Sequence, residues 1–148
     1  MTSLNYLLKK ISDIVATHTQ INTFASGNRY DWSASSAILY PCLWAIPQGA
    51  NTDIKGHKID YRINVFMMDI ELADGSNQIE ILSDTILMLL DVVAKLENDS
   101  NDPDEWELSS IGSFDPFTDT GLDTVSGHTC ELVFSCFYAG DICSEILI

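Results

Sequence analysis

The sequence predicts an α+β domain in which two helices pack on a mainly antiparallel, four-stranded sheet, in the order helix, strand, strand, helix, strand, strand. Two segments, residues 4–15 and 77–96, repeat apolar side chains at helical spacing. The alternating or continuous apolar runs that are typical of strands occur at four other places, residues 37–47, 59–72, 106–114 and 127–142. Because short connections join consecutive strands, we expect antiparallel pairs, with the helices against one face.

Length and composition indicate one packed domain, residues 1–148. A chain of 148 residues with 46% hydrophobic side chains can bury a sizeable core and does not have the composition of a disordered protein. The N-terminus lacks the features of a signal peptide, and the longest apolar runs are too short to span a bilayer. We therefore expect a cytoplasmic protein without membrane contact and with reduced cysteines, namely Cys42, Cys130, Cys136 and Cys143.

The first predicted helix has one apolar stripe and follows Thr2 and Ser3, whose hydroxyls can cap its first turn. Residues 19–36 are rich in Asn, Ser, Gly and Thr, so we expect an exposed loop. Aromatic residues within this loop suggest that it docks on another surface. Pro41 has no backbone N–H to donate to a neighbouring strand. We therefore expect the first strand at an edge or at the start of the sheet. A turn or hairpin connection is expected at 49–58.

The most informative block runs from residue 58 to 96 and contains the longest strand and the second helix. In the strand, Ile63, Val65 and Met67 share one face, whereas Phe66 and Met68 share the other. The buried face therefore changes near 65–67, so that either a bulge restores the register or the strand is covered on both sides.

The second helix is apolar on more than one side. One broad face contains Ile79, Leu82, Ile86, Leu89, Leu90, Val93 and Leu96. Ile81, Leu87, Met88 and Val92 lie elsewhere around the helix, and only a narrow polar stripe remains. So much apolar surface exceeds what a lone small domain needs, and we expect part of it to contact another subunit.

The remaining segments are polar connections and two strands. An acidic loop is expected at 97–105, and a second loop is expected at 115–127, which is too rich in Asp, Thr, Gly and Pro for the core. Overall, 22 acidic residues oppose 7 lysines and arginines, a formal net charge of −15. No basic patch is visible, so the composition disfavours binding to nucleic acid or to anionic lipid.

Candidate chemical sites do not match known patterns. The acidic loop 97–105 has Pro103 where a calcium loop would need a ligand. Cys130 and Cys136 are spaced along one strand face, too far apart for a zinc knuckle, and are better interpreted as buried small hydrophobes. The three histidines occur in unrelated contexts. We expect no catalytic activity, no cofactor and no metal.

The segment VFMMDIELADGSNQIEILSDTILMLLDVVAKL, the loop-flanked WELSSIGSFDPFTD and the closing ELVFSCFYAGDIC resemble, in that order, the tail terminator and neck proteins of tailed bacteriophages. The resemblance covers most of the chain, from Leu4 to Ile142. It implies a small α+β subunit that closes into a ring at the head-proximal end of the tail, or in the neck as a head-tail connector. The expected location is the virion, after assembly in the host cytoplasm.

The resemblance further implies contacts with identical subunits and with other neck, portal or tail proteins, while the genome passes through the lumen without specific binding. Docking elements would be the loops 19–36, 97–105 and 115–127. Candidate interface residues from the strand, the helix and the loops are Met67, Met68, Leu87, Met88, Val92, Trp32 and Phe117. An alternative function is a small acidic inhibitor that mimics DNA and occupies a host nucleic-acid-binding protein, although its acids would have to be spaced regularly along exposed surfaces.

Overall fold

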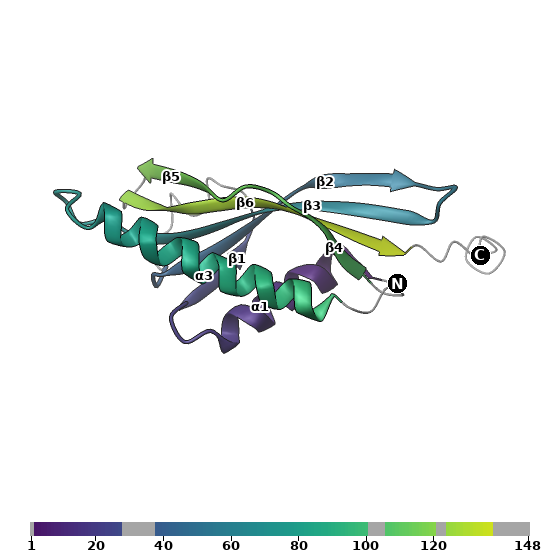
Figure 1. Ribbon diagram of the computed structural model, residues 1–148, viewed down its shortest axis with the longest axis horizontal. Coiled ribbons are helices and arrows are strands. Elements are labelled where there is room, and N and C mark those ends of the chain that lie inside the picture. The colour runs from purple at the N-terminus through teal and green to yellow at the C-terminus, as the bar shows by residue number, and fades with distance from the viewer. Residues whose placement is uncertain (1, 28–37, 101–105, 121–123, 138–148) are drawn as a thin grey trace.

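A computed structural model describes residues 2–27, 38–100, 106–120 and 124–137. Trp32, the acidic residues 101–105 and Cys143 lie outside the described residues, as does the end of the last predicted strand. Figure 1 shows the elements in chain order, which are α1 (Leu4–Thr17), β1 (Thr23–Ser26), β2 (Cys42–Asp53), β3 (Lys58–Ile70), α3 (Gln78–Asp99), β4 (Trp106–Ile111), β5 (Asp115–Thr120) and β6 (Thr124–Phe137).

The prediction of a four-stranded antiparallel sheet is wrong. The described residues form a six-stranded mixed sheet in the order β1-β2-β3-β6-β4, with β5 also paired to β6. Strand β1 runs parallel to β2, whereas the other pairs are antiparallel. The order of elements is therefore helix, three strands, helix, three strands.

The two strands missing from the prediction, β1 and β5, lie inside the segments 19–36 and 115–127 that were expected to be loops. Strand β1 is only four residues long, and β5 exposes every other side chain to solvent. Edge strands need little apolar surface because their neighbour supplies the hydrogen bonds, and this is why polar composition was misleading here.

Strands β4 and β5 pair one after the other with successive parts of β6. Trp106 to Ile111 pair with the second half of β6, and Asp115 to Thr120 pair with the first half. At the break between them, the Gly112 amide still donates to the Glu131 carbonyl oxygen at 2.8 Å. A Cβ at position 112 would approach that oxygen to 3.2 Å, so glycine permits this close approach.

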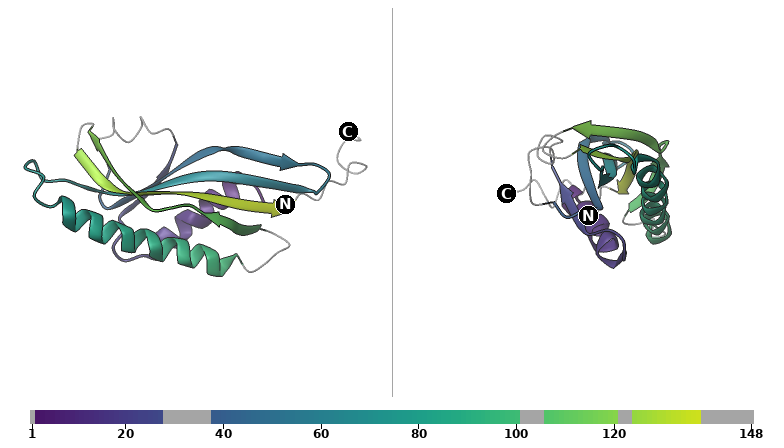
Figure 2. Two further views of the ribbon diagram at one scale, coloured as in Figure 1. Left: turned by 45° about the horizontal axis from the view of Figure 1, so that its top comes forward. Right: turned by 90° about the vertical axis from the view of Figure 1, so that its left-hand side faces the viewer.

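Both helices lie on the same side of the sheet, as the end-on view in Figure 2 shows. The hydroxyl of Ser3 caps α1 by accepting a hydrogen bond from the Tyr6 amide at 3.2 Å. Where the helices meet, Lys10 Nζ is 3.5 Å from the Asp99 carboxylate and His18 Nε2 is 3.1 Å from the Asp91 carboxylate. These contacts fix α1 against α3.

The long strand β3 is covered on both faces, which is the second of the two alternatives that its pattern allows. Val65 and Met67 belong to the main core between the sheet and the helices. Phe66 and Met68 belong to a second cluster on the opposite face, with Cys42, Trp44 and Val125. The pairing of β3 with β6 runs without a register shift through this region. Buried apolar clusters therefore lie on both faces of the sheet, and only one of them includes residues of the helices.

Helix α3 turns toward the core a face that coincides only in part with the broad apolar face of its sequence. The buried side chains are Ile81, Thr85, Met88, Leu89, Val92, Val93 and Leu96. Ile79 and Leu90, which lie on the broad apolar face, are exposed, and a polar residue, Thr85, is buried. Thr85 is accommodated there because its hydroxyl bonds the Ile81 carbonyl oxygen and the ring of His128.

Candidate functional site

The outward side of α3 carries a mostly apolar stripe that the described part of the chain leaves uncovered. We define this outer stripe as Ile79, Ser83, Ile86, Leu87 and Leu90, which recur at the spacing of one helix face. Ile79 is 72% exposed, Leu87 60% and Leu90 50%. Single exposed apolar residues are ordinary on a protein surface, but a continuous stripe along a helix marks an interaction surface.

Acidic side chains follow one border of the outer stripe. Glu80, Asp84 and Asp91 are exposed and lie four and seven residues apart, so they share one line along the helix. Asp91 also contacts His18 of α1. An apolar strip with an acidic border is suited to a partner that presents apolar and basic groups together.

A second exposed feature is the end of the hairpin formed by β2 and β3. We call residues 48–58 the arm, because every one of its side chains is exposed. Its register with β3 shifts between Pro47 and Gly49, where a bulge redirects the strand. The turn at the tip is held by the Gly56 amide, which donates to the Asp53 carboxylate at 2.9 Å. Ile54, at this tip, is 73% exposed.

The arm has a shallow hollow of about 190 Å³. It is lined by Thr52, Asp53, Ile54, Lys58 and Ile59. Two isoleucine side chains and the aliphatic stem of Lys58 give it apolar surface, and Asp53 and Lys58 add charges of both signs. The arm is therefore shaped to receive an apolar side chain.

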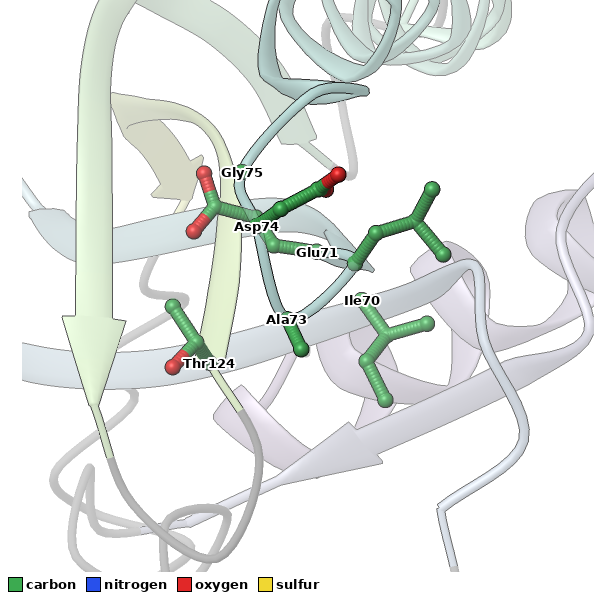
Figure 3. A pocket seen from close by; sticks show the side chains of 7 residues that line it. Ile70, Glu71, Ala73, Asp74, Gly75 and Thr124 are labelled. Atoms are coloured by element: carbon green, nitrogen blue, oxygen red, sulfur yellow. The ribbon is translucent and has the colours of Figure 1, made fainter.

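The largest of the described hollows, about 470 Å³, lies where β3 turns toward α3 (Figure 3). It is lined by Ile70, Glu71, Leu72, Ala73, Asp74, Gly75 and Thr124. Its carboxylates hold the local structure: Glu71 accepts from the Ser126 hydroxyl at 2.8 Å, and Asp74 accepts from the Ser76 amide at 3.0 Å. The hydrogen bond from Ser76 lowers the pKa of Asp74. These groups act as turn supports, as polar side chains commonly do.

Asn77 completes this turn. Its side-chain oxygen accepts from the Leu72 amide at 2.8 Å, and its side-chain nitrogen donates to the Ile70 carbonyl oxygen at 3.3 Å. Gly75 has a positive φ of 69°, which glycine adopts without strain. The DGS segment therefore fixes the entry of α3, and with it the direction of the outer stripe.

The thiols of the described residues are buried and weakly acidic. Burial raises the pKa of Cys42 to about 12 and the pKa values of Cys130 and Cys136 to about 11 each. Cys130 and Cys136 lie in the main core, and Cys42 lies in the second cluster. At neutral pH these thiols are protonated and pack as small apolar groups.

No protein-family model matches the chain, and no curated protein sequence matches it significantly. Within the described ranges, no group of three His, Cys, Asp or Glu side chains could hold a metal ion. A helix long and apolar enough to cross a membrane is likewise not found among the residues that the structure describes.

The candidate interface residues fall into different environments. Met67, Met68, Met88 and Val92 are buried by the chain itself and present almost no surface to a partner in this conformation. Leu87 is exposed on the outer stripe. Phe117, on β5, is half-buried and packs edge-on against Phe66 with ring centroids 5.2 Å apart.

The arm, Ile79 and Leu90 were not among the candidate residues. Segment 49–58 was interpreted only as a turn or hairpin connection. The feature of its sequence that could have indicated an interaction surface is an isoleucine, Ile54, followed by two lysines within five residues. Ile79 and Leu90 were not singled out, because apolar spacing alone does not tell which side of an all-round apolar helix meets the sheet.

Proposed function

We propose that this protein is a non-catalytic structural subunit that closes into an oligomeric ring at the head-proximal end of the tail, or in the neck, of a tailed bacteriophage. The observation that carries the ring is the outer stripe of α3, an apolar surface left uncovered on a chain with a net charge of −15. Large uncovered apolar surfaces are unfavourable in water, and a subunit interface removes them.

The phage setting is supported by the resemblance of the block from residue 58 to 96 and of the closing strands to tail terminator and neck proteins. Ring closure requires two different patches on each subunit, because one patch of a copy must fit another patch of the next. The outer stripe and the arm are two such patches. Other virion proteins of the neck and tail would then contact the remaining surfaces of the ring.

The ring is tested by the mass of the protein in solution at increasing concentration, combined with negative-stain imaging. We expect a concentration-dependent rise to one closed assembly of uniform size, seen as rings. A closed dimer, or a monomer at all concentrations up to the millimolar range, would contradict the proposal, because neither uses two different patches.

A pair of adjacent substitutions separates interface from core. Leu87→Asp should abolish assembly and keep the fold, since Leu87 is exposed. Met88→Asp should unfold the protein, because it buries a charge in the main core. Lys95→Asp, at an exposed position of α3 outside the outer stripe, is the control and should leave both assembly and folding unchanged. Circular dichroism and solution mass report the two properties.

Location in the virion is tested by gold-labelled antibodies against the chain on purified phage particles that contain it. Label at the junction of head and tail is the expected result. Label on the capsid surface or at the distal tail tip would contradict a terminator or neck position.

A further inference from the structure

We propose that the arm of one copy docks on the outer stripe of α3 of the next copy, so that neighbouring subunits are joined head to tail. This inference rests on the ring proposed above and deepens it by naming the two surfaces that meet. Its occupant is a second copy of this chain, which supplies the arm.

Charge distribution is the first argument. The arm carries Lys55 and Lys58 against a single acid, Asp53, so it is a net basic stretch of an acidic chain. Helix α3 has five acids and one lysine. Copies of a chain with a net charge of −15 repel one another, and contact between them is favoured where the few cations of one copy meet acids of the next.

Apolar complementarity is the second argument. Ile54 is an exposed apolar side chain of the arm and lines the hollow together with Lys58 and Ile59. Leu87 and Leu90 project from the outer stripe. A leucine from the stripe entering the hollow, with Ile54 resting between the leucines, would remove these side chains from water, and a central apolar contact with a charged rim is the common anatomy of an interface.

The arm is also held in one conformation before any contact. Ladder pairs run from Gly49 with Arg62 to Asp53 with Lys58, and the Asp53 carboxylate fixes the turn. A Cβ at position 56 would overlap the Asp53 carboxylate, so glycine leaves room for that carboxylate at the tip. Such preorganisation lowers the entropy lost on binding.

The positions of the two surfaces determine the type of contact. In Figure 1 the arm, where β2 meets β3, and the first turns of α3 lie toward opposite ends of the long axis of the molecule. The arm therefore reaches the start of the outer stripe of another copy, not that of its own. A contact between opposite ends repeats in one direction, and it closes into a ring when the rotation between copies permits.

Charge reversal tests the contact. An arm variant, Lys55→Glu with Lys58→Glu, and a helix variant, Glu80→Lys with Asp84→Lys, change only exposed side chains. Each alone should raise the concentration at which half of the chains are assembled by about a hundredfold, because like charges then face each other across the contact. The control, Lys9→Glu with Lys95→Glu, has the same net charge as the arm variant and should assemble as the unmodified protein does.

Mixing the two variants is the decisive measurement. The reversed arm of one fits the reversed helix of the other, and the unmodified arm fits the unmodified helix, so the mixture should regain assembly in an alternating order. If the mixture does not regain assembly, or if the arm variant assembles as well as the control, the arm does not dock on α3.

Cross-linking gives a readout that does not depend on charge. With Cys143→Ser as background, Ile54→Cys together with Leu87→Cys should form disulfide-linked ladders of copies on mild oxidation, while each cysteine alone should not. If the unmodified protein forms rings but the double-cysteine variant gives no ladder, the arm contact is overturned and the ring function stands. Unmodified protein that never assembles would overturn both.

Discussion

Met67 and Met68 are neighbours in β3, yet their fully buried side chains belong to different hydrophobic clusters on opposite faces of the sheet. Met67 packs in the main core with residues of both helices, and Met68 packs with Cys42, Trp44 and Phe66. Around Met67 and Met68, both faces of the sheet are therefore covered by other side chains. Each methionine is expected to contribute to stability through its own cluster.

Met67→Ala and Met68→Ala should each lower the free energy of unfolding by about 2–5 kcal/mol, the usual cost of removing a buried side chain of this size. Ile70→Ala, at the exposed end of the same strand, should cost less than about 1 kcal/mol. Urea denaturation followed by tryptophan fluorescence measures all three. A loss for Met68→Ala no larger than that for Ile70→Ala would mean that the second cluster is not a core.

Gly127→Ala should be among the most damaging single substitutions in the chain. Gly127 pairs with Met68 on one side and Phe117 on the other, and a Cβ there would overlap the carbonyl oxygen of Met67. Because backbone must then move, we expect a loss of about 4 kcal/mol or more, or no folding at all.

Gly75→Ala is the matched control for this prediction. Nothing lies within 4 Å of a Cβ at position 75, so only the positive φ of 69° opposes the substitution. The expected cost is about 1–2 kcal/mol. Equal losses for the two variants, measured by thermal and urea denaturation, would contradict the close packing of β6 against β3.

Part of this fold could be predicted from the sequence because its signals are local. Ser3 caps α1 as expected, and β3 has apolar residues of both parities because both of its faces are covered. The four-residue β1 and the polar β5 could not be predicted in this way. Their hydrogen bonds come from β2 and β6, and nothing in their own composition requires a strand.

The candidate surface shows the same limit. Leu87 was identified because it lies off the main apolar face of α3, but Met88 beside it is in the core. Thr85 lies on the buried face of the helix, where its hydroxyl contacts the ring of His128 of β6. That contact joins residues 43 positions apart, so it cannot be predicted from the apolar periodicity of the helix.

The buried thiols should be unreactive in the folded protein. Burial raises the pKa of Cys42 to about 12, and thiol reagents attack the thiolate. In a Cys143→Ser variant at pH 8, we expect Ellman's reagent to give no rapid reaction under native conditions and three thiols after denaturation. One thiol reacting within seconds in the native protein would show that the core around it opens readily.

The stability of the protein should depend on pH through His128. Its ring is buried against α3, where Nδ1 lies 3.1 Å from the Thr85 hydroxyl oxygen. That hydroxyl lies 2.7 Å from the Ile81 carbonyl oxygen and donates its single hydrogen there, so the Thr85 oxygen accepts from Nδ1–H of His128. Burial lowers the pKa of His128 below its usual 6.5, and the negative charge of Asp115 opposes this shift in part.

A lowered pKa of His128 means that the unfolded chain binds a proton more readily than the folded one. The contribution of the neutral ring to stability is therefore complete above the unfolded value of 6.5. It is lost as the pH falls from there toward the lower pKa of the folded state. Between pH 7 and pH 5, the free energy of unfolding should fall more for the unmodified protein than for His128→Gln, which has no titrating ring but keeps an N–H donor for Thr85. Parallel pH profiles of the two proteins in urea denaturation would contradict this assignment and would mean that acids elsewhere in the chain determine the pH dependence.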